Sequence, residues 1–387
     1  MILFGRRPTP TKDDLLVLTA PIRPSSLSLH DTAGPDRMLL LSRGARVGAF
    51  RLVDIPADEP QAGPSRKRWA FCFGEEKRTS TATRTAPIAA PDHPLLQRIG
   101  DTPLVELKRL PEGFRLFAKV EGSNPGGSVK DRAASAIVVD AWRRGFLPRQ
   151  RLLDASSGNT GIAYAMLGAA LGFGVTLCIP RSASSERKRI LNAYGAELIQ
   201  TDAGEGSDGA ILEARRLAHA EKQLFHYVDQ YSNPENPRAH ETGTGPEILS
   251  QLGGLPLDLF VAGLGTSGTF VGTARHLLSA SPKTRRVSVE PDEGFHGIEG
   301  LKHLATAIVP PIFDPSLIDR REAVSTEEAQ DTARRLAREE GLLTGVSSGA
   351  AVAVALRVAR ETGARTAVVI LPDTGDRYIS DRFWEAK

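Results

Sequence analysis

One lysine stands in a sequence frame that suits covalent chemistry with a carbonyl compound. Residues 124–132 read Asn-Pro-Gly-Gly-Ser-Val-Lys-Asp-Arg, so a turn-forming run precedes Lys130 and an apolar helical stretch follows at 133–142. We expect Lys130 near a helix N-terminus, where the positive end of the helix dipole favours a neutral amine over ammonium. Only the neutral amine attacks a carbonyl carbon to form a Schiff base. This segment alone leaves open an ordinary surface lysine beside a helix cap.

Two loops rich in glycine and hydroxyl groups could each bind an anion. Residues 155–161 read Ala-Ser-Ser-Gly-Asn-Thr-Gly and lie between an expected strand and an expected helix. Free N–H groups at a helix start can hold a carboxylate, and the side chains of Ser156, Ser157 and Thr160 would add hydroxyl groups. Taken alone, this loop could equally be a simple helix cap.

The second loop, residues 261–269, reads Val-Ala-Gly-Leu-Gly-Thr-Ser-Gly-Thr and again follows an expected strand. Its glycines match the dinucleotide fingerprint G-x-G-x-x-G, and Glu290 ends the next strand at a suitable distance. An NAD-binding oxidoreductase is therefore a rival interpretation. Several strands precede this loop, whereas the fingerprint usually opens a domain. Because its hydroxyl groups suit one terminal phosphate, we favour a phosphate site.

A third short motif suggests a hydrolase but does not satisfy the requirements of one. Residues 345–349 read Gly-Val-Ser-Ser-Gly, which matches the nucleophile elbow G-x-S-x-G. The elbow needs a later acid and then a histidine, whereas the last histidine, His303, precedes it. The segment is either a capping turn for a helix at 350–362 or a serine that faces a ligand. The sequence holds no HExxH or CxxC motif, so we expect no metal site.

Alternating strands and helices must position these segments from about residue 94 onward. The strand-like runs are Leu116–Val120, Arg151–Ala155, Val175–Ile179, Glu197–Thr201, Leu257–Ala262, Val287–Glu290 and Thr366–Leu371. The helical segments are 131–144, 160–171, 184–194, 208–220, 246–252, 269–280, 326–340 and 350–362. Ser325 with Glu328 predicts a capping box, and Gly195 and Gly341 predict helix ends. This alternation predicts parallel sheets covered on both faces, in two lobes with a site between them.

The composition is that of an ordinary globular protein, and it favours the cytoplasm. The chain has 387 residues, of which 41% are hydrophobic and 25% charged, and its net charge of +3 indicates neither nucleic acid nor a membrane as partner. No apolar run approaches the roughly 18 residues that span a bilayer, and prolines and charges interrupt any signal-peptide core. Residues 1–92 are predicted to be a weakly structured, basic, proline-containing extension. Isolated strands are possible there at 15–18, 38–41 and 69–73.

Taken together, these segments resemble the cysteine synthase family of pyridoxal-phosphate enzymes, the fold type II group. The resemblance covers roughly residues 94–385 and includes Gly-Asp-Thr-Pro-Leu at 100–104, Gln-Tyr-Ser-Asn-Pro at 230–234 and Gly-Asp-Arg-Tyr at 375–378. It implies a two-lobed α/β fold like that of the tryptophan synthase β chain. The implied lobes are a large cofactor-binding lobe, 93–121 plus 233–387, and a smaller mobile substrate lobe, 122–232.

The resemblance also implies a role for each candidate residue around pyridoxal 5'-phosphate. Lys130 would bond to the cofactor and then move the α-proton of the substrate. Asn159 would hydrogen bond to the ring oxygen, and Ser347 would face the pyridine nitrogen. The cofactor phosphate would be bound by Gly265, Thr266, Ser267, Gly268 and Thr269. The substrate carboxylate would be bound by Ser156, Ser157, Thr160 and Gln230.

The implied reaction is β-replacement on O-acetylserine or O-phosphoserine by sulfide, which gives L-cysteine. The alternatives are a condensation of serine with homocysteine, as in cystathionine β-synthases, and a catalytically idle relative that acts as a binding scaffold. The short stretch 294–311 resembles the B-type enzymes, which suggests a roomier site for larger sulfur donors. Within it, Lys302 stands where phosphoserine-using relatives place an arginine, and we expect it to recognise a leaving phosphate. The family resemblance also leads us to expect a homodimer.

Overall fold

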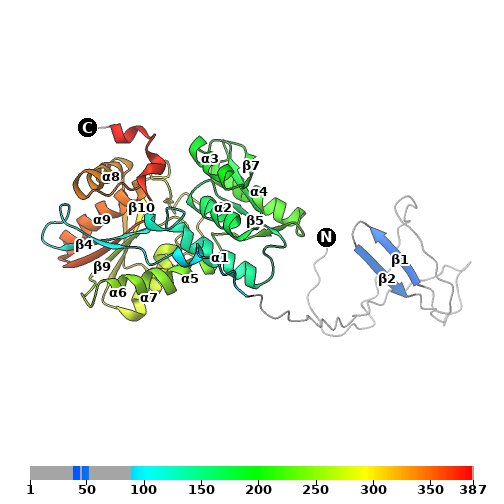
Figure 1. Ribbon diagram of the computed structural model, residues 1–387, viewed down its shortest axis with the longest axis horizontal. Helices are drawn as coiled ribbons and strands as arrows, with labels where there is room; N and C mark the ends of the chain where they lie inside the picture. The colour runs from blue at the N-terminus through cyan, green and yellow to red at the C-terminus, as the bar shows by residue number, and fades with distance from the viewer. Residues whose placement is uncertain (1–37, 44–45, 52–88, 386–387) are drawn as a thin grey trace, which may run out of the picture. The chain divides into compact units, whose positions relative to one another are not determined.

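The computed structural model describes residues 38–43, 46–51 and 89–385 of the chain (Figure 1). The chain separates into two units, Met1–Arg84 and Thr85–Lys387. In the first unit, β1 (Met38–Arg43) pairs antiparallel with β2 (Arg46–Arg51). The strand expected at 38–41 is thus confirmed, and those at 15–18 and 69–73 lie outside the described residues. Most of the extension predicted at 1–92 also lies outside them.

A six-stranded sheet forms one part of the second unit, in the order β11-β10-β9-β12-β4-β3. Its strands pair in parallel except for β3, which runs antiparallel to β4 at the sheet edge. The strands are β3 (Leu104–Leu107), β4 (Arg115–Val120), β9 (Leu259–Gly263), β10 (Arg285–Pro291), β11 (Arg320–Val324) and β12 (Thr366–Leu371).

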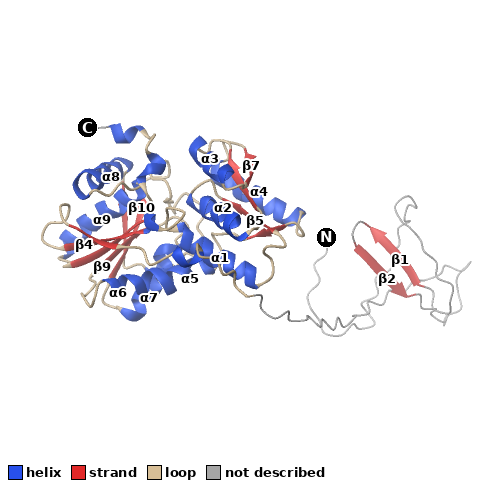
Figure 2. Ribbon diagram, viewed as in Figure 1, coloured by secondary structure: helices blue, strands red, loops and turns tan. Residues whose placement is uncertain are grey.

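A four-stranded sheet forms the other part, in the order β7-β6-β5-β8, and all its strands are parallel. The strands are β5 (Arg151–Ala155), β6 (Val175–Pro180), β7 (Glu197–Thr201) and β8 (Phe225–Tyr227). Figure 2 shows that helices flank both sheets, as parallel sheets require. The predicted two-lobed α/β architecture is therefore confirmed, whereas the exact lobe boundaries and the mobility of the smaller lobe stay predictions.

The α-helices of the second unit lie between these strands in the chain. They are α1 (Lys130–Arg143), α2 (Asn159–Leu171), α3 (Ser185–Ala193), α4 (Gly206–Ala220), α5 (Glu235–Ala239), α6 (Gly245–Gln251), α7 (Gly268–Ala280), α8 (Thr326–Glu340) and α9 (Val346–Thr362). A π-helical turn, His240–Thr244, joins α5 to α6. Within residues 38–43, 46–51 and 89–385, no helix is long and apolar enough to cross a membrane.

Side chains that alternate along the central strands bury both faces of each sheet. In β4, Leu116 and Ala118 join the core that includes α9, whereas Phe117 points to the opposite face and joins the core that includes Phe270 of α7. The four-stranded sheet likewise separates one core with α1 and α2 from another with α4. Because both faces are covered, the carboxyl ends of the strands and the loops that follow them are left to form a site.

Most predicted elements are present, and several of the differences concern short segments. All the strands predicted after residue 94 are confirmed, with ends that differ by a few residues. The sequence analysis did not predict β3, β8, β11 or α5. Of these, β8 has only three residues and β11 reads Arg-Arg-Glu-Ala-Val, so neither forms a run of apolar residues long enough to be recognised as a strand. The Ser325 cap is confirmed, since its side chain accepts a hydrogen bond from Glu328 N. Gly341 ends α8 and Gly195 follows α3, and both have positive φ, at 71° and 80°.

Candidate active site

A cavity of about 460 Å³ is lined by segments from both sheets, and Lys130 lies on its wall. An adjoining cavity of about 40 Å³ shares Lys130 with it. The larger cavity is lined by the predicted residues Lys130, Ser156, Ser157, Asn159, Thr160, Gln230, Gly265, Thr266 and Lys302. The smaller one adds Ser267, Thr269 and Ser347. The structure thus brings the predicted site residues together, with Gly268 one residue further along the same loop as Ser267.

Lys130 is the first residue of α1, one residue earlier than the predicted helix start. The preceding residue, Val129, is bonded to the end of β12, because Val129 N donates to the main-chain oxygen of Pro372 at 2.7 Å. Burial lowers the pKa of the Lys130 amine, and the charges of Asp373 and Glu121 oppose that shift. The direction agrees with the neutral amine that we expected. The main cause is burial rather than the helix dipole on which the prediction depended.

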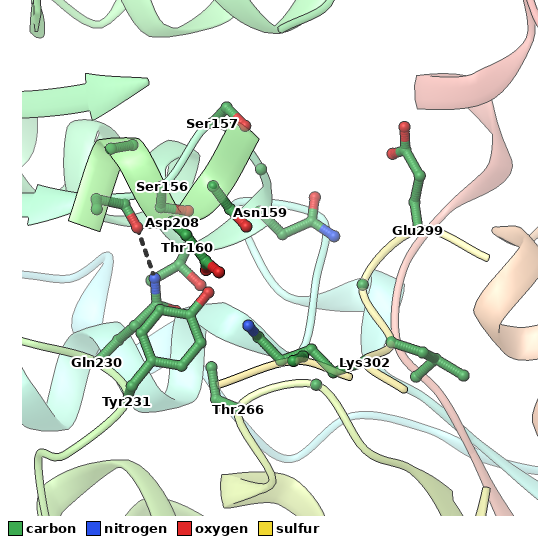
Figure 3. Close-up of a pocket in the computed structure, with 18 of the residues that line it drawn as sticks. Ser156, Ser157, Asn159, Thr160, Asp208, Gln230, Tyr231, Thr266, Glu299 and Lys302 are labelled. Atoms are coloured by element: carbon green, nitrogen blue, oxygen red, sulfur yellow. Dashed lines mark hydrogen bonds between the residues drawn. The ribbon is translucent and has the colours of Figure 1, made fainter. Parts of the chain in front are cut away.

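The loop after β5 leads directly into α2, so the free N–H groups of a helix start lie beside the cavity. Ser156 Oγ accepts a hydrogen bond from Gly161 N at 3.1 Å, which closes the loop on itself. A side chain at Gly161 would place Cβ 2.4 Å from the main-chain oxygen of Ser156, so this close approach requires glycine. Gln230 reaches the same loop, because its Nε2 donates to the Ala155 oxygen at 3.3 Å (Figure 3).

The loop after β9 leads into α7, which begins at Gly268. Ser267 precedes this helix in the left-handed region, with φ 70°, and its buried Oγ has no hydrogen-bond partner. A side chain at Gly265 would place Cβ 2.2 Å from the Gly300 oxygen. A helix start, free main-chain N–H groups and an unsatisfied buried hydroxyl together form a cradle for an anion the size of a phosphate.

Ser347 lies in the first turn of α9, where it is buried and lines the smaller cavity. The sequence placed a helix start at 350 and left a capping turn open for 345–349. That helix start is wrong, because α9 begins at Val346 with Gly345 as its N-cap. Small residues in the first turn concealed the helix start. Its serine hydroxyl is a neutral group at the end of the cavity that also holds Lys130.

Asp373 is a site residue that the sequence reasoning missed, and it fixes the orientation of Asn159. Asn159 Nδ2 donates to Asp373 Oδ2 at 2.7 Å, and the Tyr378 hydroxyl donates to the same oxygen at 2.5 Å. Arg377 donates to Asn159 Oδ1 and to the Gly126 oxygen. The pKa of Asp373 is raised, because the effect of burial outweighs the opposing effect of the hydrogen bonds from Tyr378 and Asn159. The Gly-Asp-Arg-Tyr motif at 375–378 was the available signal, but no role had been given to it.

Lys302 follows β10 and projects into the larger cavity, where its Nζ lies 5.0 Å from the centroid of the Tyr231 ring (Figure 3). Burial lowers the pKa of the Lys302 amine, and the charge of Asp208 opposes that shift. Lys302 is therefore a cavity residue rather than a solvated surface lysine. Within the part of the chain that the structure describes, no group of three or more His, Cys, Asp or Glu side chains could hold a metal ion.

The arrangement fits pyridoxal phosphate on three observations. The unpartnered Ser267 hydroxyl and the helix start of α7 suit its phosphate. A partly buried lysine with a lowered pKa suits its aldehyde carbon. Asn159 donates one N–H to Asp373 and keeps a second, which suits a ring oxygen.

Comparison with known proteins gives a consistent result. Residues 95–373 match the family described as "Pyridoxal-phosphate dependent enzyme". The chain is 44% identical over 303 residues to cysteine synthase of Aquifex aeolicus, which covers 76% of this chain and 92% of that protein. It is 45% identical over 289 residues to cysteine synthase B of Salmonella typhimurium, which covers 74% of this chain and 94% of that protein.

Solved structures agree with the sequence comparisons. Cysteine synthase from Entamoeba histolytica superposes with a TM-score of 0.72 at 35% identity, covering 78% of this chain and 94% of that one. O-ureido-L-serine synthase also gives a TM-score of 0.72, at 38% identity, covering 77% of this chain and 96% of that one. The match to a cofactor family other than the dinucleotide-binding proteins removes the basis for interpreting residues 261–269 as an NAD fingerprint.

Proposed function

This chain belongs to the cysteine synthase family of pyridoxal-phosphate-dependent enzymes, and we propose that it makes L-cysteine by β-replacement on an O-activated L-serine. Sulfide would replace the oxygen substituent on the β-carbon. The observation that carries this proposal is the position of Lys130. It lies between two loops suited to anions, on the wall of a cavity large enough for cofactor and substrate, and its pKa is lowered by burial.

Two groups of residues would hold the cofactor and the substrate. Pyridoxal phosphate, when bound, supplies an electron sink for the electron pair left at the α-carbon. The loop Gly265–Thr269 would hold the phosphate, and Asn159 would donate to the ring oxygen. Ser156, Ser157, Thr160 and Gln230 would bind the substrate carboxylate. The α-carbon of the substrate would then lie near the Lys130 amine, which would remove the α-proton and later return it.

Ser347 would decide what happens after proton removal. A neutral hydroxyl, unlike a carboxylate, does not force the pyridine nitrogen to be protonated. The cofactor would then withdraw electrons less strongly, and loss of the β-substituent would be favoured over transamination. The presence of Lys130, Asn159 and Ser347 at one cavity argues against a catalytically idle relative.

The activated group would be acetate or phosphate, and Lys302 bears on the choice. Its ammonium group projects into the cavity from the segment after β10. A cation there would attract the dianionic phosphate of O-phosphoserine more strongly than the neutral ester of O-acetylserine. The proposal also includes a homodimer in the cytoplasm, which light scattering after size-exclusion chromatography and cell fractionation would test.

The visible absorption spectrum of the purified protein tests the proposal. We expect a yellow protein whose band shifts when O-acetylserine or O-phosphoserine is added and returns when sulfide follows, with release of L-cysteine. A protein that stays colourless with added pyridoxal phosphate would overturn the proposal. A yellow protein that releases no cysteine from either donor would overturn the reaction but leave the cofactor in place.

A further inference from the structure

A buried histidine lies behind the loop proposed to hold the cofactor phosphate and is hydrogen bonded to it. His240 begins the π-helical turn His240–Thr244 and is 1% exposed. Its Nε2 lies 3.4 Å from Thr269 Oγ1, and its Nδ1 lies 2.9 Å from Thr244 Oγ1. Thr269 lines the smaller cavity, whereas His240 lines neither of the two cavities at Lys130. The imidazole ring therefore reaches the site only through the Thr269 hydroxyl.

Close packing of α7 on the π-helical turn makes this contact possible. Gly272 lies about one turn after Thr269 on α7. A Cβ at Gly272 would lie 1.9 Å from the main-chain oxygen of Pro237 and 2.8 Å from His240 Cβ. Any larger residue would push α7 away from the turn and separate the ring from the hydroxyl. π-Helical turns are frequent at functional sites, and this one presents a ring nitrogen to the proposed phosphate loop.

The His240 ring is neutral near pH 7. Burial lowers its pKa well below the ordinary value for histidine. The positive charges of Arg132 and Lys130 lower the pKa further, against the opposing charge of Glu247. A neutral imidazole carries its proton on one nitrogen only, so one ring nitrogen donates a hydrogen bond and the other accepts one.

A neutral ring can be arranged in two ways between the two threonines. With the proton on Nδ1, the ring donates to Thr244 and accepts the hydroxyl proton of Thr269, which then presents only lone pairs to the cavity. With the proton on Nε2, the ring donates to Thr269, whose own proton is free for a ligand. Because the oxygens of a phosphate dianion accept hydrogen bonds, only the second arrangement stabilises a phosphate there.

A second threonine of the same loop has an equivalent partner. Thr266 Oγ1 accepts a hydrogen bond from the buried Asn236 Nδ2 at 3.1 Å, so the Thr266 proton is likewise left for a ligand. The buried Ser267 Oγ has no hydrogen-bond partner within the part of the chain that the structure describes. All three hydroxyl groups line the smaller cavity and can donate to one anion.

We propose that His240 is a positioning residue for the cofactor phosphate: its Nε2–H donates to Thr269 Oγ1 and so directs the Thr269 hydroxyl proton to the phosphate. The inference rests on the proposed phosphate site at Gly265–Thr269. His240 takes no part in the reaction on the substrate, because it contacts the cavity only through Thr269. Its loss should therefore weaken binding of the phosphate group and leave contacts to the rest of the cofactor intact.

The experiment titrates the full-length apoenzyme with pyridoxal 5'-phosphate and with pyridoxal, which lacks the phosphate, and follows the visible absorbance. The variants are His240→Gln, whose amide nitrogen can take the place of Nε2, and His240→Asn, whose shorter amide cannot reach Thr269. Thr269→Val removes the hydroxyl and keeps the side-chain shape. His276→Asn is the matched control, because His276 lies two turns after Thr269 on α7 and lines neither cavity.

We expect His240→Asn to raise the dissociation constant of pyridoxal 5'-phosphate about tenfold and to leave that of pyridoxal unchanged. Thr269→Val should have the same selective effect, and the double variant should be no worse than Thr269→Val alone, because His240 acts through that hydroxyl. His240→Gln should retain most of the wild-type affinity, and His276→Asn should change neither constant.

The inference is overturned if His240→Asn weakens both ligands in equal proportion, since that is the result of a merely structural role. It is also overturned if His240→Gln loses as much affinity for pyridoxal 5'-phosphate as His240→Asn does. Thr269→Val tests it independently of how well the histidine variants fold, because an unchanged ratio of the two constants in that variant would contradict it. If the wild-type protein binds neither ligand, the proposed function itself fails; if it binds both equally well, the proposed phosphate site fails.

Discussion

Asn236 donates a hydrogen bond from Nδ2 to the main-chain oxygen of Gln230 at 2.8 Å, and the same nitrogen donates to Thr266 Oγ1 at 3.1 Å. Gln230 lies beside the loop proposed to bind the substrate carboxylate, and Thr266 lies in the loop proposed to bind the cofactor phosphate. Asn236 is 2% exposed, so one buried amide connects the segment at Gln230 to the loop that contains Thr266. A Cβ at Gly268 would lie 1.9 Å from Asn236 Oδ1, which explains why glycine begins α7.

We therefore predict that Asn236→Asp weakens both binding functions at once. The change keeps the side-chain shape but replaces the donor by an acceptor, so the Gln230 oxygen loses its partner. The loss of such a buried hydrogen bond costs about 1–3 kcal/mol. KM for the activated serine and the dissociation constant of pyridoxal phosphate should each rise roughly tenfold, measured by steady-state kinetics and by titration of the apoenzyme.

Asn233→Ala is the control for this prediction. Asn233 lies in the same turn, but its side chain bonds only to the Val228 oxygen and to Glu235 N. It should change the two constants much less than Asn236→Asp does. If Asn236→Asp alters only one of the two constants, the two loops are not joined through this amide.

Asp154 should make the stability of the protein depend on pH. Burial raises its pKa to about 7, even though its oxygens accept hydrogen bonds from Ala155 N at 2.8 Å and Gln230 N at 3.3 Å. Its unfolded pKa is about 3.9. Between these values the folded state binds a proton that the unfolded state has lost. The free energy of unfolding therefore falls as the pH rises through this window, by up to about 1.4 kcal/mol per pH unit for this group.

Asp154→Asn removes this contribution, because the amide has no proton to lose. Urea unfolding at pH 5 and pH 7 should show a smaller loss of stability in the variant than in the wild type. Asp131, whose pKa is also raised to about 7 by burial, remains in both proteins and contributes equally. Parallel pH profiles for the two proteins would show that Asp154 is already ionised at pH 5 in the folded state, which would contradict the prediction.

Lys302→Ala should separate the two candidate donors. If Lys302 attracts the leaving phosphate, kcat/KM for O-phosphoserine should fall by about tenfold, the value of one charge-assisted hydrogen bond. O-acetylserine should be affected far less, since its ester carries no charge. Lys283→Ala is a control, because Lys283 lies on the surface away from this cavity. An unaltered preference between the two donors in Lys302→Ala would remove this role.

The sequence identified those site residues that carry a local pattern. Lys130 follows a Pro-Gly-Gly turn, and the serine and threonine loops each stand between a strand and a helix, so their chemistry could be interpreted from neighbouring residues. The length and position of the alternating elements after residue 94 likewise follow from hydrophobic periodicity.

The residues that the sequence did not reveal act across long separations. Asp373 contacts Asn159, and Asn236 contacts Thr266, but no spacing in the chain announces either pair. Their roles depend on how the sheets bring distant loops together.

The central claim is that Lys130 forms the covalent bond to pyridoxal phosphate, and one measurement tests it directly. The holoenzyme is reduced with borohydride, digested and analysed by peptide mass spectrometry, with Lys302→Ala treated in the same way. We predict a phosphopyridoxyl group on the peptide that contains Lys130 in both proteins. Its attachment to any other lysine, or its absence from every peptide, would contradict the account.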